Sequence, residues 1–139
     1  MIVSSAARPR GHPGYTETLP CAAESAEPAR QLVRTALGAW GLDVLADDGA
    51  LVVTELVANA ARHAQGRSIR VSVSRPGTDA VWVAVADRST ARPAPREAGP
   101  YDVGGRGLAL VDALSDRWGS DPLPFGKRVW AVLTCKDAD

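Results

Sequence analysis

The chain has 139 residues, and its 16 basic residues balance 16 acidic ones. This length is typical of a single domain, and such a domain buries roughly 70% of the surface that its unfolded chain exposes, which is enough for a hydrophobic core. A balanced charge argues against direct binding to nucleic acid or to an anionic membrane surface, because both attract basic proteins. No apolar run of the sequence approaches the roughly 20 residues of a membrane span.

The N-terminus and the cysteines bear on the cellular compartment. Residues 1–14 mix Arg, Pro and Gly without the apolar core of a signal peptide, so we expect a flexible N-terminal arm, a domain over residues 15–139 and a cytoplasmic protein. Cys21 and Cys135 lie far apart, without the spacing of a zinc site or a disulfide framework. We expect two reduced thiols, with a disulfide between the strands that carry them as the alternative.

The first half of the chain predicts one strand and two helices. Polar and apolar residues alternate over residues 15–21, which favours a short strand. An apolar stripe at i, i+3, i+4 spacing predicts a helix that ends at Gly41, and a second stripe predicts a long helix from Asp43 or Asp47 to residue 64. These stripes are typical of helices that pack on a core.

The polar side of the long helix carries a pattern of its own. At 100° per residue, Asp48, Glu55, Asn59, Arg62 and His63 fall within about a third of the helix circumference. Glu55 and Asn59 are one turn apart and point the same way. An Asn oxygen can complete the shell of a Mg²⁺ ion, and a carboxylate beside it can accept a proton in phosphoryl transfer. The alternative is an ordinary solvated helix face, and for His63 an ordinary surface residue.

Two strands and a long loop follow. Residues 69–75 and 80–87 are β-rich and are joined by a short polar segment, which predicts a hairpin. Residues 88–104 are rich in Pro and Arg and have no periodicity, so we interpret them as a mobile lid. Asp87 ends an apolar strand, where a partly desolvated carboxylate needs a donor such as the exocyclic amine of adenine. A capping role at the start of a turn is the alternative.

Glycines open the next predicted helix. The sequence Gly104-Gly105-Arg106-Gly107-Leu108 precedes an apolar stripe, and the free N–H groups of such a helix start attract phosphate. The segment lacks the Gly-Lys-Ser/Thr of a Walker loop, and no strand leads directly into it as in a dinucleotide fingerprint. We expect the helix to run from Gly107, and the alternative to a phosphate site is a flexible turn with a helix start.

Strands around Trp118 and over residues 129–134 complete the predicted elements. A run of antiparallel strands, with helices to cover one face, predicts an α/β two-layer sandwich of the α+β kind. Its open face would take a partner or face water.

The order of these motifs resembles that of the GHKL nucleotide-binding superfamily, which includes gyrase, histidine kinases and the MutL proteins. The sequence over residues 51–64 is most similar to the small stand-alone anti-sigma-factor serine kinase-like proteins of actinomycetes. The same similarity extends to Gly105-Arg106-Gly107-Leu108, Trp118-Gly119 and Gly126-Lys127. The resemblance implies a Bergerat-type fold, with a mixed, mainly antiparallel sheet and helices on one face.

The resemblance also implies a ligand and a set of roles. ATP would bind with Mg²⁺; Asn59 would hold the metal, Glu55 would be the catalytic base and Asp87 would read adenine. The glycines would let the backbone approach the phosphates, and the basic residues would meet phosphate charge. The further residues expected around the nucleotide are Arg62, His63, Gly105, Arg106, Gly107, Leu108 and Lys127.

Kinases of this kind phosphorylate a Ser or Thr of a STAS-type anti-anti-sigma partner and bind a sigma factor. We therefore expect a Mg-ATP-dependent serine/threonine kinase that acts as an anti-sigma factor, with a homodimer as the form that combines both activities. Two positions depart from the superfamily pattern, since Ser89 stands in place of Gly and Lys127 in place of Thr. The alternatives are a non-catalytic ATP-binding interaction module and, third, a small-molecule ATPase, for which the chain has no separate substrate domain.

Overall fold

The structure, a computed structural model, describes residues 14–63, 67–87 and 105–135. Within these ranges the strands form one antiparallel sheet in the order β1-β2-β3-β5-β4. The strands are β1 (Gly14–Pro20), β2 (Ser68–Gly77), β3 (Ala80–Asp87), β4 (Arg117–Leu123) and β5 (Gly126–Thr134). The α-helices of the described part are α1 (Ala26–Ala39), α2 (Ala46–His63) and α3 (Gly105–Leu114), and short 3-10 turns precede the first two.

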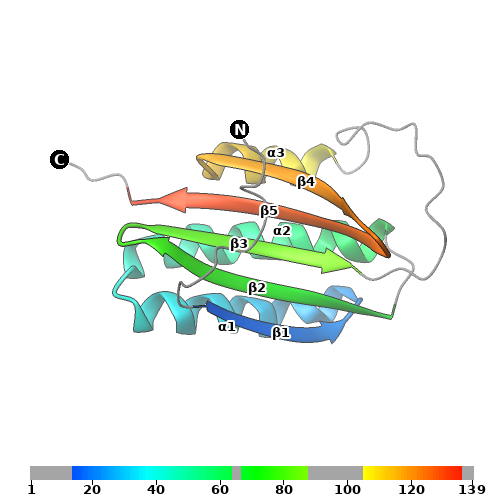
Figure 1. The fold of residues 1–139 in the computed structure, drawn as a ribbon, viewed down its shortest axis with the longest axis horizontal. Coiled ribbons are helices and arrows are strands. Elements are labelled where there is room, and N and C mark those ends of the chain that lie inside the picture. The colour runs from blue at the N-terminus through cyan, green and yellow to red at the C-terminus, as the bar shows by residue number, and fades with distance from the viewer. Residues whose placement is uncertain (1–13, 64–66, 88–104, 136–139) are drawn as a thin grey trace.

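All three helices lie on one face of the sheet (Figure 1). α1 covers β1 and β2, α2 runs behind the middle of the sheet, and α3 lies at the β4 side. The predicted two-layer α+β sandwich with a mainly antiparallel sheet is therefore confirmed, and it is consistent with a Bergerat fold.

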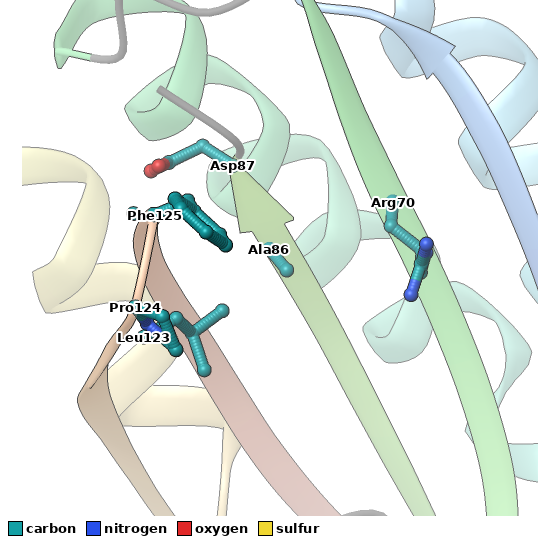
Figure 2. A pocket seen from close by; sticks show the side chains of 7 residues that line it. Arg70, Ala86, Asp87, Leu123, Pro124 and Phe125 are labelled. Atoms are coloured by element: carbon teal, nitrogen blue, oxygen red, sulfur yellow. The ribbon is translucent and has the colours of Figure 1, made fainter. Parts of the chain in front are cut away.

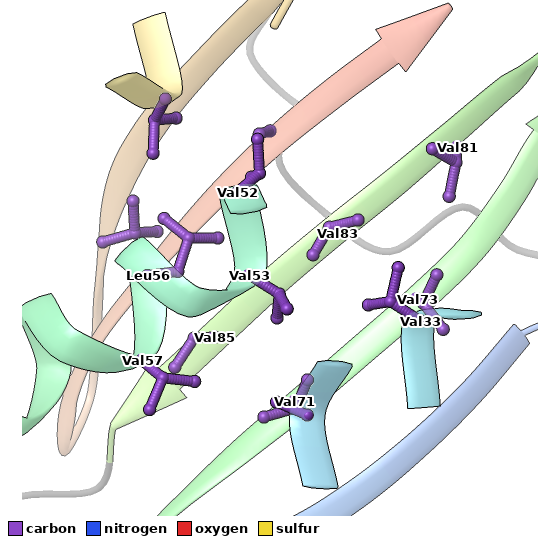
Figure 3. Close-up of a cluster of buried hydrophobic side chains, with 14 of the residues drawn as sticks. Val33, Val52, Val53, Leu56, Val57, Val71, Val73, Val81, Val83 and Val85 are labelled. Atoms are coloured by element: carbon purple, nitrogen blue, oxygen red, sulfur yellow. The ribbon is translucent and has the colours of Figure 1, made fainter. Parts of the chain in front are cut away.

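Valine alternation builds the core between the two layers. In β2 and β3 every second residue points to the helices, and Val71, Val83 and Val85 are almost completely buried there. Val83 and Val85 lie beside Val53 and Val57 of α2, as Figure 3 shows. Burying one such side chain stabilises the fold by about 1.5–3 kcal/mol, so the sheet and α2 stabilise each other.

The other face of the sheet has a smaller apolar cluster at its centre. Trp82 and Ala84 of β3 and Trp130 and Val132 of β5 form it, and Trp82 is only 2% exposed. Gly119 of β4 pairs with Trp130, and a Cβ at Gly119 would lie 2.8 Å from the Trp130 ring. The absence of a side chain at Gly119 therefore makes room for the indole, and the centre of this face does not meet water.

Several predicted boundaries moved. β1 begins at Gly14, and α3 begins at Gly105, not at Gly107. The start was placed later because glycine is a weak helix former, less favourable than Ala by about 1 kcal/mol. The predicted lid over residues 88–104 and the arm over residues 1–13 fall outside the described residues. No helix in the described ranges is long and apolar enough to cross a membrane.

The two cysteines are free, which excludes the disulfide alternative. The N–H of Cys21 donates to the carbonyl of Arg67, just before β2 begins, at 3.0 Å. The N–H of Cys135 donates to the carbonyl of Asp79, beyond the far end of β2, at 2.8 Å. The cysteines therefore lie at opposite ends of the sheet.

Candidate functional site

Asp87 ends β3 on the helix side of the sheet and is 5% exposed. Its carboxylate has two contacts with β5. The backbone N–H of Lys127 donates to Oδ1 at 3.2 Å, and the Lys127 ammonium lies 3.9 Å from Oδ2. A buried carboxylate with both oxygens facing donors keeps further acceptor lone pairs for a ligand.

Burial and charge act on this carboxyl in opposite directions. Burial raises the pKa of Asp87, whereas the charge and the backbone N–H of Lys127 lower it, and the net pKa is above the usual 3.8. The pKa of the Cys21 thiol is raised by burial and then by the negative charge of Asp87, so this thiol stays neutral near neutral pH. The end of β1 therefore lies close enough to Asp87 to feel its charge.

Gly126 shapes the surroundings of Asp87. A Cβ at this position would overlap both the carbonyl oxygen and the Oδ1 of Asp87. Only a residue without a side chain lets the start of β5 approach so closely. In the sequence, Gly126 marked a family resemblance, and its packing role was missed because the partner lies 39 positions earlier in the chain.

Glu55 and Asn59 lie one turn apart on α2, as predicted. Asn59 is 4% exposed and Glu55 is half-buried, so the alternative of a solvated helix face is wrong for Asn59. The Cys21 thiol contacts the carbonyl oxygen of Ala60 at 3.7 Å. This contact joins the second half of α2 to the end of the sheet at which Asp87 lies. Asn59 and Asp87 are thus two buried polar residues at the same end of the molecule.

The last turn of α2 carries Arg62 and His63, both exposed. Their placement keeps them near the same end of the fold, and His63 takes part in an interaction within the protein. Their expected role toward a nucleotide stays a prediction.

The start of α3 completes this end of the molecule. Figure 1 shows α3 beginning at the end where β3 stops and α2 finishes. Its first turn holds Gly105, Arg106, Gly107 and Leu108, of which Leu108 is buried. The Nε1 of Trp118 in β4 donates to Oδ1 of Asp112 at 2.8 Å, which ties α3 to the sheet. Free N–H groups in such a first turn suit an anion, and the expected contact with phosphate stays a prediction.

A hollow of about 180 Å³ lies beside Asp87 on the side of the sheet away from α2. Figure 2 shows the exposed Phe125, in the β4–β5 turn, close to Asp87, with Arg70 across from it on β2. The lining residues are Arg70, Ala86, Asp87, Leu123, Pro124, Phe125 and Gly126.

This donor set fits an adenine nucleotide. A buried carboxylate can accept from an exocyclic amine, an amide oxygen can hold a hard cation, and a helix start can receive phosphate. Within the described ranges no three His, Cys, Asp or Glu side chains cluster as metal ligands, so a cation there would take ligands from the phosphates beside Asn59. The fold and the site together define a nucleotide-binding α+β domain.

The comparison with protein families agrees with this class. The model of the histidine kinase-like ATPase domain matches residues 19–133, so the chain belongs to this family, within the GHKL superfamily. The chain is accordingly an ATP-binding domain of the histidine kinase-like type. A search of curated proteins found no match to the chain.

Proposed function

We propose that this protein is a Mg-ATP-dependent serine/threonine kinase that acts as an anti-sigma factor and phosphorylates a STAS-type anti-anti-sigma protein. The observation that carries the proposal is the pair on α2, since Asn59 is buried and Glu55 is half-buried one turn before it. A carboxylate on an ordinary solvated helix face would not need a buried amide one turn away.

ATP supplies the phosphoryl group when it is bound. Asn59 would hold the Mg²⁺ ion through its side-chain oxygen, and Asp87 would accept a hydrogen bond from the adenine amine. Glu55 would accept the proton of the partner's hydroxyl group, whose oxygen would bond to the γ-phosphorus as ADP leaves. The N–H groups at the start of α3 orient the phosphates.

The partners follow from the same proposal. A cytoplasmic sigma factor binds to this protein when the anti-anti-sigma protein is absent or phosphorylated. A homodimer would combine the kinase activity with binding of the sigma factor. The balanced charge of 16 basic and 16 acidic residues supports protein partners over direct contact with nucleic acid.

The test is transfer of radiolabelled phosphate from ATP to candidate anti-anti-sigma proteins. Glu55→Gln should lower the rate by about 10²–10⁴-fold while ATP still binds, because only the general base is lost. Asn59→Ala should lower the Mg²⁺-dependent affinity for ATP. Glu27→Gln is a matched control, since Glu27 is an exposed carboxylate on α1 that pairs with Arg30.

A second function is separated by the same assay. Ser89 replaces the glycine of the superfamily pattern, which favours a non-catalytic module whose bound ATP organises a surface for partners. Binding of ATP by the native chain without transfer to any partner would establish this module and overturn the kinase. Hydrolysis of ATP without any protein acceptor would instead support a simple ATPase.

A further inference from the structure

The contacts of Lys127 raise a question that the family resemblance leaves open. The resemblance groups Lys127 with the cations that meet phosphate. In the structure its ammonium lies 3.9 Å from Oδ2 of Asp87, and its backbone N–H donates to Oδ1 of the same carboxylate at 3.2 Å. One residue therefore contacts both oxygens of Asp87.

The geometry points to Lys127 as a positioning residue that orients the Asp87 carboxylate toward the base of the nucleotide. In this role Lys127 is not a ligand of the phosphates. The adenine in this statement rests on the proposed function. The contact with Asp87 does not.

Packing supports a defined arrangement of this pair. Gly126 leaves no Cβ in the space that the Asp87 carboxylate takes up, so the carboxylate lies directly against the start of β5. The Asp87 side chain is 6% exposed and that of Lys127 is 35% exposed. The ammonium is thus partly shielded from water, which strengthens its attraction to a buried carboxylate.

Charge supports the same role. Burial raises the pKa of Asp87, and Lys127 is the cation that lowers it. The Cys21 thiol, after β1, lies near this carboxylate and stays neutral, and Arg70 of β2 lines the hollow beside it. An ionised carboxylate accepts a hydrogen bond more strongly than a protonated one. The Lys127 ammonium therefore favours the ionised form of Asp87, which is the better acceptor for a donor on the ligand.

The first experiment uses the protein without nucleotide. The carboxyl carbon of Asp87 is titrated by NMR in the native chain and in Lys127→Met, which keeps the backbone N–H and the apolar stem. The titration should move to higher pH in Lys127→Met and return toward the native value in Lys127→Arg. An unchanged titration would overturn the inference, whether or not the protein binds ATP.

The second experiment compares ligands by calorimetry. If Lys127 positions Asp87, Lys127→Met should weaken adenosine and ATP by the same factor, roughly 3–30-fold for a lost charged contact. The loss of affinity on acidification should begin at a higher pH in this variant. If only ATP is weakened, Lys127 meets phosphate and the inference is wrong.

Arg128→Gln is the matched control. Arg128 follows Lys127 on β5, points to the other face of the sheet and lies at the same 3.9 Å from its own carboxylate, Asp121. Its replacement removes one positive charge and should leave both the titration and the ligand ratio unchanged. Lys127→Gln repeats the test if Lys127→Met does not fold by circular dichroism. If the native chain binds no nucleotide at all, the proposed function fails and the titration of Asp87 still decides the role of Lys127.

Discussion

At the scale of single residues, Asp87 combines a cost in stability with a use in binding. Removing a carboxylate from water is unfavourable unless its charge is compensated, and its raised pKa shows that Lys127 compensates only in part. Because the folded pKa lies above the unfolded value, the folded state binds more protons than the unfolded state between the two values. Stability therefore falls as the pH rises through that window, and the ionised carboxylate at neutral pH weakens the fold.

The variant Asp87→Asn tests whether the buried carboxylate lowers stability and strengthens ATP binding. Its amide oxygen can still accept from the Lys127 N–H, but the charge is gone, and the Lys127 ammonium is partly in water. We expect ATP binding to weaken by about 1–3 kcal/mol, as for a lost charged hydrogen-bond partner. We expect the nucleotide-free variant to be at least as stable as the native chain near neutral pH, and the difference to shrink in acid.

Calorimetry with ATP and urea unfolding at several pH values provide the two measurements. Unchanged ATP affinity would remove Asp87 from the site. A variant that is less stable than the native chain at neutral pH and equal to it in acid would contradict the sign of the pKa argument.

At the scale of elements, α2 packs on the core with one face and contributes residues to the candidate site with another. One face carries Leu56 and Val57 into the core, and the flank carries Glu55 and Asn59 to the site. At 100° per residue, the centres of these two sets are about 130° apart around the helix, so the core holds the polar pair in position without using it for packing. The burial of Asn59 arises from the neighbouring elements, which the sequence of α2 alone does not describe.

The β4–β5 hairpin makes a separate prediction. Gly119 lies opposite Trp130, and a Cβ there would lie 2.8 Å from a ring that is 8% exposed and has little room to move. We expect Gly119→Ala to lower the free energy of unfolding by about 1–3 kcal/mol, the usual cost of overpacking. Urea unfolding followed by tryptophan fluorescence measures it.

Gly77→Ala is the control for general loss of glycine. Gly77 ends β2, is exposed, and a Cβ there would meet its nearest atom at 4.0 Å. Equal losses for Gly119→Ala and Gly77→Ala would show that contact with Trp130 is not the cause.

At the scale of the whole molecule, the site gathers residues from elements that are remote in the sequence. Asp87 ends β3, Lys127 is the second residue of β5, Cys21 follows β1, and Asn59 lies in α2. A ligand that contacts several of these elements binds the folded state only, and so it stabilises the domain as a unit.

Thermal unfolding with nucleotide tests this coupling. At about 100 times its dissociation constant, Mg-ATP should add about 2.7 kcal/mol to the free energy of unfolding. For a domain of this size, that corresponds to an increase in Tm on the order of 10 °C. Omitting Mg²⁺, or using Asn59→Ala, should reduce the increase. An equal increase in all three cases would argue against metal binding through Asn59.

The sequence by itself determined the element types, the two-layer class and the spacing of Glu55 and Asn59. These features depend on the periods of strands and helices, two and 3.6 residues, which are visible in short stretches of sequence. The beginning of α3 at Gly105 was misplaced, since a first helical turn needs no internal partners for its N–H groups and leaves a weak signal.

Only the tertiary structure decided that Asn59 is buried, that Gly126 lies against Asp87, and that Lys127 contacts both oxygens of that carboxylate. These facts depend on the antiparallel register that brings the start of β5 beside the end of β3. A strand pairing across some 40 residues is chosen by the packing of the whole sheet on its helices, and no local pattern records it.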